Sequence, residues 1–137
     1  MVELFYESII QQEIFQKAYE TKPLLIPIPL HWKRFNKRGY NHSKLLADGL
    51  SKSLNLRLAE VLQRTKKTKS QFGLKLKERK ENLKNAFSIV PNVPIAQYPN
   101  IFLVDDILTT GSTLLEAARI LKKNGARKVW GLTLARD

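Results

Sequence analysis

Apolar side chains recur at helical spacing in three segments of the chain, and each segment predicts an amphipathic helix. The segments are residues 2–18, 41–55 and 113–126. Asn41 or Ser43 is the expected cap of the second helix, and Gly125 is the expected stop of the third. The side chains expected to face inward are Leu45, Leu46 and Leu50 in the second helix and Leu114, Leu115, Ala118 and Leu121 in the third.

Short apolar runs alternate with these helices and predict strands. The clearest are residues 24–30 (LLIPIPL), 87–90 (FSIV), 101–106 (IFLVDD) and 128–136 (KVWGLTLAR). Residues 57–63 favour a strand, with a short helix as the alternative. Strands alternating with helices predict an α/β fold whose central, mainly parallel sheet is flanked by helices. We expect one domain over residues 1–137, with an N-terminal helix in residues 1–20 and a core in residues 24–136.

Three polar segments are expected to be loops. Residues 31–40 (HWKRFNKRGY) form a basic loop with Gly39 as its hinge, and residues 91–100 contain three prolines. A mobile basic loop is expected around residues 65–75, and residues 74–84 after it have helical character.

Positive charge dominates the composition and is concentrated in the first half of the chain. The net charge is +12, and 16 of the 24 Lys and Arg residues lie between His31 and Lys84, against four of the 12 acidic residues. Such a surface attracts nucleic acid or small phosphorylated ligands. A soluble basic surface without a specific partner explains the charge equally well.

The remaining composition excludes several classes of protein. With no cysteine there is no disulfide and no thiolate metal site. No apolar run approaches the roughly 20 residues that span a bilayer, so membrane insertion is not expected. Acidic residues interrupt the N-terminal segment, which does not resemble a signal peptide. A cytoplasmic location is therefore expected. Neither histidine, His31 or His42, has a partner at metal-ligand spacing, so each is expected to be a hydrogen-bonded structural residue.

The stretch IFLVDDILTTGST, residues 101–113, carries the strongest candidate site. Its two aspartates come at the carboxyl end of a predicted strand, where ligands bind in open parallel sheets. Its small hydroxylic residues open a helix whose N–H groups and dipole suit a phosphate, and its glycine allows close approach. The aspartates are Asp105 and Asp106, and the phosphate loop is Thr109, Thr110, Gly111, Ser112 and Thr113.

Carboxylates repel a phosphate, so the two parts of this stretch must bind different groups. A ribose 5-phosphate satisfies both, because its hydroxyls donate to carboxylates while its phosphate enters the loop. Adjacent carboxylates also attract Mg²⁺, directly or through water. The chain lacks the glycine patterns of a P-loop and of a dinucleotide-binding fold. A purely structural role, an Asx turn with a capped helix, leaves one aspartate and the hydroxyl cluster unexplained.

These residues closely resemble the phosphoribosyl pyrophosphate signature of type I phosphoribosyltransferases. Within them, the chain resembles the ComF family of competence proteins over residues 24–136. The corresponding family segments read approximately P-x-P, R-G-F-N-Q, T-x-x-Q-x-x-L and R-x-x-N. The matching residues are Pro27, Pro29, Arg38, Gly39, Tyr40, Asn41, Thr68, Gln71, Leu74, Arg79 and Asn82. His42 stands where the family usually has glutamine. Most members begin with a four-cysteine zinc module, which this chain is expected to lack.

The resemblance implies a type I phosphoribosyltransferase-like fold that binds phosphoribosyl pyrophosphate with Mg²⁺. Asp105 and Asp106 would hold the ribose and the metal, and Lys33 and Arg34 the pyrophosphate. A role in DNA uptake during natural transformation follows, with single-stranded DNA as partner. Lys37, Arg38, Lys66, Lys67 and Lys69 would serve the mobile loop or the nucleic acid.

Several alternatives stay open at this stage. One is an ordinary phosphoribosyltransferase of nucleotide or salvage metabolism, and another is a non-catalytic nucleic-acid-binding module. If pentosyl transfer occurs, its acceptor is not identified. Competence or DNA-processing proteins are further candidate partners, and an oligomer is also compatible with the sequence.

Overall fold

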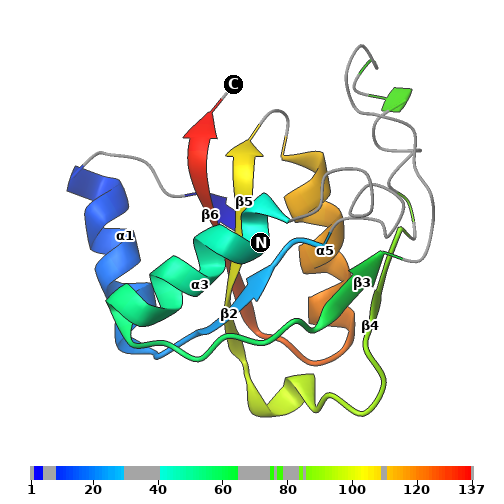
Figure 1. The fold of residues 1–137 in the computed structure, drawn as a ribbon, viewed down its shortest axis with the longest axis horizontal. Helices are drawn as coiled ribbons and strands as arrows, with labels where there is room; N and C mark the ends of the chain where they lie inside the picture. Colours follow the sequence, from blue (N-terminus) through cyan, green and yellow to red (C-terminus); the bar gives the residue numbers. More distant parts are fainter. Residues whose placement is uncertain are drawn as a thin grey trace.

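A four-stranded parallel sheet in the order β1-β6-β5-β2 organises the chain (Figure 1). The computed structural model describes residues 2–4, 9–29, 41–64, 75, 77–78, 84, 86–108 and 111–136. The strands of the main sheet are β1 (Val2–Leu4), β2 (Leu24–Pro27), β5 (Asn100–Leu108) and β6 (Lys128–Arg136). The helices are α1 (Ile9–Glu20), α3 (His42–Leu54) and α5 (Ser112–Lys123).

A second, two-stranded antiparallel sheet lies beside the main one. It pairs β3 (Leu62–Arg64) with β4 (Phe87–Ile89), and a 3₁₀ turn, η1 (Ile95–Gln97), leads from β4 towards β5. Of the predicted strand over residues 57–63, only Leu62 and Gln63 belong to β3. Leu58 forms an isolated parallel bridge with Leu25. Strands were correctly predicted at β2, β4, β5 and β6.

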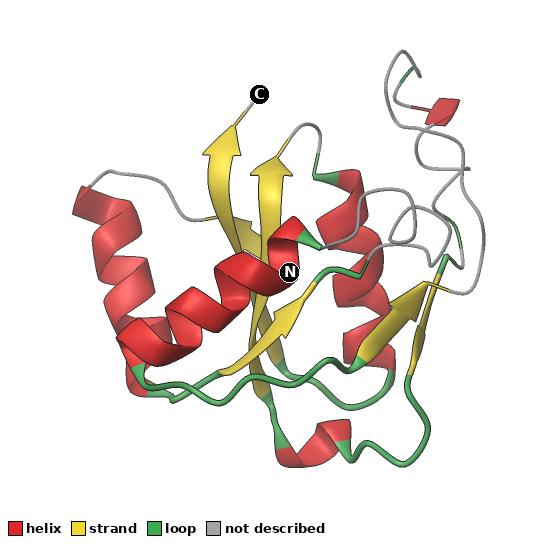
Figure 2. Cartoon of the chain, in the orientation of Figure 1, coloured by secondary structure: helices red, strands yellow, loops and turns green. Residues whose placement is uncertain are grey.

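Alternating side chains of the sheet form two hydrophobic cores. On β5, Ile101 and Leu103 pack with α5, β3 and β4, whereas Phe102 and Val104 pack with α1 and α3. Helices therefore cover both faces of the sheet, with α1 and α3 together and α5 apart (Figure 2). The predicted α/β fold with a parallel sheet flanked by helices is confirmed.

The predicted helix over residues 2–18 is wrong at its start. Val2–Leu4 form β1, which pairs in parallel with residues 129–131 of β6, and α1 begins only at Ile9. The open edge of β6 offers backbone hydrogen bonds, and this tertiary pairing overrides the helical spacing of the apolar residues.

Two leucines expected to face inward are exposed. Leu45 of α3 is 59% exposed and Leu115 of α5 is 53% exposed, whereas Leu114, Ala118 and Leu121 are buried as predicted. The buried stripe of α5 is formed by Leu114, Ala117, Ala118 and Leu121, and Leu115 lies outside it. Ser43 and Ala47 occupy the buried stripe of α3, and Leu46 and Leu50 pack at its margin.

The helix ends agree with the prediction. Asn41 caps α3, with its side chain accepting hydrogen bonds from the N–H groups of Ser43 and Lys44. Gly125 follows α5 with φ of 114°, and a Cβ there would lie 3.1 Å from the Cβ of Ala96. The expected basic loops at residues 31–40 and 65–74, and most of the expected helix at 74–84, lie outside the described residues. Among the helices described, none is long and apolar enough for a bilayer crossing.

We expect Leu121→Ala to lower the free energy of unfolding by about 2–5 kcal/mol, because it leaves a cavity under α5. The matched control, Leu115→Ala on the same helix, should change it by less than about 0.5 kcal/mol, since that side chain is exposed. Urea unfolding followed by circular dichroism measures both. Equal losses would contradict the assignment of the buried face.

Candidate functional site

The two aspartates lie in the last part of β5, at the carboxyl edge of the parallel sheet. The predicted strand end is corrected, because β5 continues past both of them to Leu108. Asp105 is opposite Thr133 of β6, and the N–H of Ile28 donates to the carbonyl of Val104 over 2.9 Å. The aspartates therefore lie on a strand rather than on a loop. β6 pairs with this strand at Asp105, and the pairing with β2 ends at the preceding residue, Val104.

The start of α3 contacts both carboxyl groups. Ser43 Oγ donates to Asp105 Oδ1 over 3.1 Å, and His42 Nδ1 lies 3.4 Å from Asp106 Oδ2. The N–H of Asp106 also donates to Asp105 Oδ1 over 2.9 Å. Although neighbouring side chains of a strand point to opposite faces, both carboxyl groups here are reached from one helix end. That they act together on a ligand remains a prediction.

Asn41 fixes the position of that helix end. Its Oδ1 caps α3, and its Nδ2 donates to the carbonyl of Ile28 over 3.1 Å, just after β2. One side chain thus ties the carboxyl end of β2 to the start of α3. The R-G-Y-N segment noted in the sequence therefore contributes, through its Asn41, to the placement of Ser43 and His42.

The pKa of Asp105 is raised from its ordinary value of 3.8 to about 7, and burial is the largest cause. The nearby Asp106 carboxyl contributes to the same rise through a hydrogen bond and through charge repulsion. The N–H of Asp106 and the hydroxyl of Ser43 act in the opposite direction, because they stabilise the charged form. Near neutral pH the Asp105 carboxyl group is therefore partly protonated when no ligand is bound.

The start of α5 follows β5 at the same edge of the sheet (Figure 1). Gly111 is its N-cap, with φ of 80° in the left-handed region, and its carbonyl accepts from the N–H of Leu115 over 2.9 Å. Ser112 is buried and Thr113 is half-buried. The first N–H groups of a helix have no intrahelical acceptor, so this end suits an anion.

The remaining predicted site residues lie outside the part of the chain that the structure describes. They are Thr109 and Thr110 of the phosphate loop, Lys33 and Arg34, and Lys37, Arg38, Lys66, Lys67 and Lys69. Their assignments remain predictions. Within the described ranges, no three His, Asp or Glu side chains gather into a metal-ligand cluster.

The sequence did not identify Ser43 as a partner of Asp105. Ser43 was considered only as a helix cap, and His42 only as a structural histidine. No periodicity links residues separated by 62 positions, so the contact depends on how α3 crosses β5. The one available signal was the polar run Asn41-His42-Ser43 at a helix start, because helix starts meet the carboxyl ends of strands in this class of fold.

A family model described as "Phosphoribosyl transferase domain" matches residues 41–137. The chain belongs to this family. The match includes the aspartates, the start of α5 and the start of α3.

Curated relatives narrow the similarity further. The chain is 44% identical to competence protein F of Haemophilus influenzae over 81% of its own length and 50% of that protein. It is 42% identical to DNA utilization protein YhgH of Escherichia coli O6:H1, over 79% and 48%. It is 36% identical to competence protein ComFC of Bacillus subtilis, over 90% and 49%. The predicted ComF resemblance is confirmed, and the chain spans about half the length of these relatives.

A crystal structure of a purine phosphoribosyltransferase from Pyrococcus horikoshii Ot3 superposes with a TM-score of 0.47 at 17% sequence identity. The superposition covers 99% of this chain and 89% of that chain, a likeness too weak to add to the family assignment.

We expect Asp105 to make stability depend on pH. Because its pKa is higher in the folded than in the unfolded chain, its contribution is fully present below about pH 4 and is lost as pH rises through about 7. The free energy of unfolding of the wild type, relative to that of Asp105→Asn, should therefore fall over this window by at most about 4 kcal/mol. Urea unfolding from pH 4 to 8, with a chelator present, measures it. A pH-independent difference would contradict the assignment.

Ser43→Ala should raise the pKa of Asp105 further, because it removes a hydrogen bond that stabilises the carboxylate. Carboxyl carbon chemical shifts followed by NMR during a pH titration measure this change. Ser51→Ala is the matched control, since Ser51 lies on the same helix and donates to the carbonyl of Leu56 instead. A fall in the pKa, or an equal change in both variants, would refute this role of Ser43.

Proposed function

We propose that this chain binds phosphoribosyl pyrophosphate with Mg²⁺ at the carboxyl edge of its sheet, and that it acts on single-stranded DNA during DNA uptake. The observation that carries the first part is the pairing of two interacting carboxyl groups on β5 with a helix start at the same edge. These features suit the hydroxyl and phosphate ends of one ligand.

The ribose would be held by the aspartates. Ser43 and the N–H of Asp106 both donate to Oδ1 of Asp105, and a ribose hydroxyl would donate to Oδ2. Asp106 would accept the neighbouring hydroxyl while His42 orients its carboxylate. A hydroxyl donor on Asp105 would stabilise its ionised form, so ligand binding is expected to lower the pKa of Asp105.

The 5-phosphate would bind at the start of α5, in the loop of residues 109–113. The left-handed conformation of Gly111 turns the chain into the helix without a side chain in the way. N–H groups and the helix dipole would compensate the phosphate charge.

The two adjacent carboxylates suit Mg²⁺ better than a structural zinc ion. Mg²⁺ commonly takes one or two carboxylates together with waters and substrate phosphates, whereas a structural zinc site needs four protein ligands. Asp105 and Asp106 supply the two carboxylates. The bound ion would neutralise part of the pyrophosphate charge.

In a transfer reaction, pyrophosphate would leave C1 of the ribose as an acceptor attacks. The contribution of the chain would be to hold the ribose between β5 and α3 and to keep the reacting carbon away from water. Lys33 and Arg34 would neutralise the departing pyrophosphate, and the basic loop around residues 65–75 would close over the ligand.

The DNA part of the proposal rests on charge and on the relatives. The chain carries a net charge of +12, and the relatives are named for competence and for DNA utilization. Single-stranded DNA would bind through phosphate contacts from the basic segments, and a cytoplasmic location is part of this proposal.

Calorimetric titration with phosphoribosyl pyrophosphate tests the ligand. We expect binding by the wild type that weakens without Mg²⁺, and a loss of roughly ten- to hundredfold in affinity for Asp105→Asn and for Asp106→Asn. The reason is that each loses a charged hydrogen-bond acceptor, typically worth about 1.5–3 kcal/mol. Asp48→Asn is the matched control, because Asp48 pairs with Lys44 on the outer side of α3.

Absence of binding by the wild type would refute the proposed ligand. Equal binding by all variants would show that the two aspartates do not contribute to binding phosphoribosyl pyrophosphate. Release of pyrophosphate on addition of a free purine or pyrimidine base would favour an ordinary phosphoribosyltransferase instead.

A further inference from the structure

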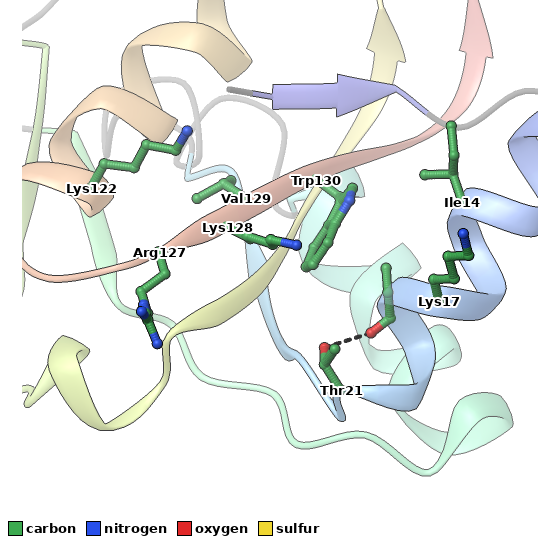
Figure 3. Close-up of a pocket in the computed structure, with 9 residues that line it drawn as sticks. Ile14, Lys17, Thr21, Lys122, Arg127, Lys128, Val129 and Trp130 are labelled. Atoms are coloured by element: carbon green, nitrogen blue, oxygen red, sulfur yellow. Dashed lines mark hydrogen bonds between the residues drawn. The ribbon is translucent and has the colours of Figure 1, made fainter.

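A cavity lies at the opposite edge of the sheet from the aspartates, between α1 and the start of β6 (Figure 3). Its volume is about 430 Å³, within the range of ligand sites. Four of the residues that line it are cations: Lys17, Lys122, Arg127 and Lys128. None of the lining residues that the structure describes is acidic. The cavity therefore has the charge of a site for a polyanion.

The cations come from three different parts of the chain. Lys17 lies on α1, Lys122 in the last turn of α5, and Arg127 and Lys128 at the entry to β6. In Figure 3, Lys122 and Arg127 lie at one side of the cavity and Lys17 at the other, with Lys128 between them. This spread suits a ligand with repeated charges better than a single phosphate, which would need converging donors.

The floor of the cavity is apolar and rigid. Trp130 is only 9% exposed, and its ring forms a T-shaped pair with Phe102 at 5.8 Å between centroids. With so little of its surface exposed, the indole offers little area for a base to stack on. A nucleic acid bound here would be held through its backbone, with little preference for base type.

The cavity and the aspartates are separate sites on the same strand pair. Lys128 opposes Asn100 at one end of the β5–β6 ladder, and Thr133 opposes Asp105 five residues further along. At about 3.3 Å per residue this separates them by roughly 16 Å. Substitutions at the cavity can therefore be made without touching the proposed ribose site.

We propose that this cavity is a binding site for the phosphodiester backbone of single-stranded nucleic acid, distinct from the basic segments at residues 31–40 and 65–75. The inference rests on the nucleic-acid partner proposed above. A single strand is favoured over a duplex because a cavity set between a helix and a strand admits one backbone but not a double helix.

The test compares the wild type with the triple variant Lys17→Gln, Arg127→Gln, Lys128→Gln. These three side chains are exposed, so their loss should leave the melting temperature nearly unchanged. The control is Lys52→Gln, Arg57→Gln, Lys123→Gln, which removes the same charge from exposed cations that do not line the cavity. The probe is a labelled oligothymidylate of about 12 nucleotides, within the site size of many single-strand binders. Fluorescence anisotropy is measured across a salt series.

We expect the cavity variant to bind at least about tenfold more weakly than the control variant at low salt. The slope of log affinity against log salt should be shallower for the cavity variant than for the wild type by about 2. The reason is that the variant loses three phosphate contacts, each of which contributes about 0.7 to the slope for a single strand. Replacing thymine by a mixed sequence should change the affinity little.

Four results would overturn the inference. If the cavity variant binds like the control variant while Lys66→Gln, Lys67→Gln, Lys69→Gln loses affinity, the DNA contacts lie elsewhere and the proposed function stands. If the wild type does not bind, the nucleic-acid part of the proposed function fails too, while the phosphoribosyl pyrophosphate part remains testable. Equal binding of a duplex would refute the single-strand assignment. Competition by inorganic phosphate at micromolar concentration would instead identify a site for a small anion.

Discussion

The structure depends on the burial of β5 between two helical layers. Its alternating side chains supply both cores, with Ile101 and Leu103 on one face and Phe102 and Val104 on the other. β5 is paired on both sides, to β2 and to β6, so it cannot shift register without moving every one of these side chains to the wrong core. The positions of Asp105 and Asp106 are fixed as a consequence.

The same burial sets the chemistry of the aspartates. Asp105 follows four fully buried residues, so its carboxyl group is largely withdrawn from water, and this desolvation is the main cause of its raised pKa. A carboxylate held in this way is poorly stabilised until a ligand supplies hydroxyl donors or a cation. The cost of burying Asp105 in the free protein is thus the physical basis on which a ribose or Mg²⁺ could be favoured at this site.

Much of this arrangement could be predicted from local sequence, and the rest could not for identifiable reasons. The apolar run before Asp105 predicts a buried strand, and Asn41 predicts a helix cap, because both signals lie within a few residues. The strand at Val2–Leu4 depends on the free edge of β6, which lies over 120 residues away. The contact of Ser43 with Asp105 likewise depends on the crossing of α3 over β5. The exposure of Leu115 has a local reason, since it lies outside the stripe that Leu114, Ala117, Ala118 and Leu121 form on α5.

The β5–β6 pair carries a different charge at each end. At the carboxyl end, Asp105 accepts a hydrogen bond from Ser43 at the start of α3 and Asp106 lies beside His42. At the other end, cations from α1, α5 and β6 line a cavity. A nucleic acid is repelled by the first and attracted by the second, whereas a sugar phosphate with free hydroxyls can use the first together with the start of α5. The two proposed sites would therefore select different ligands by charge, and their separation of roughly 16 Å along the strands would allow both to be occupied at once. Any coupling between them has to pass through the strands or the helices packed on them.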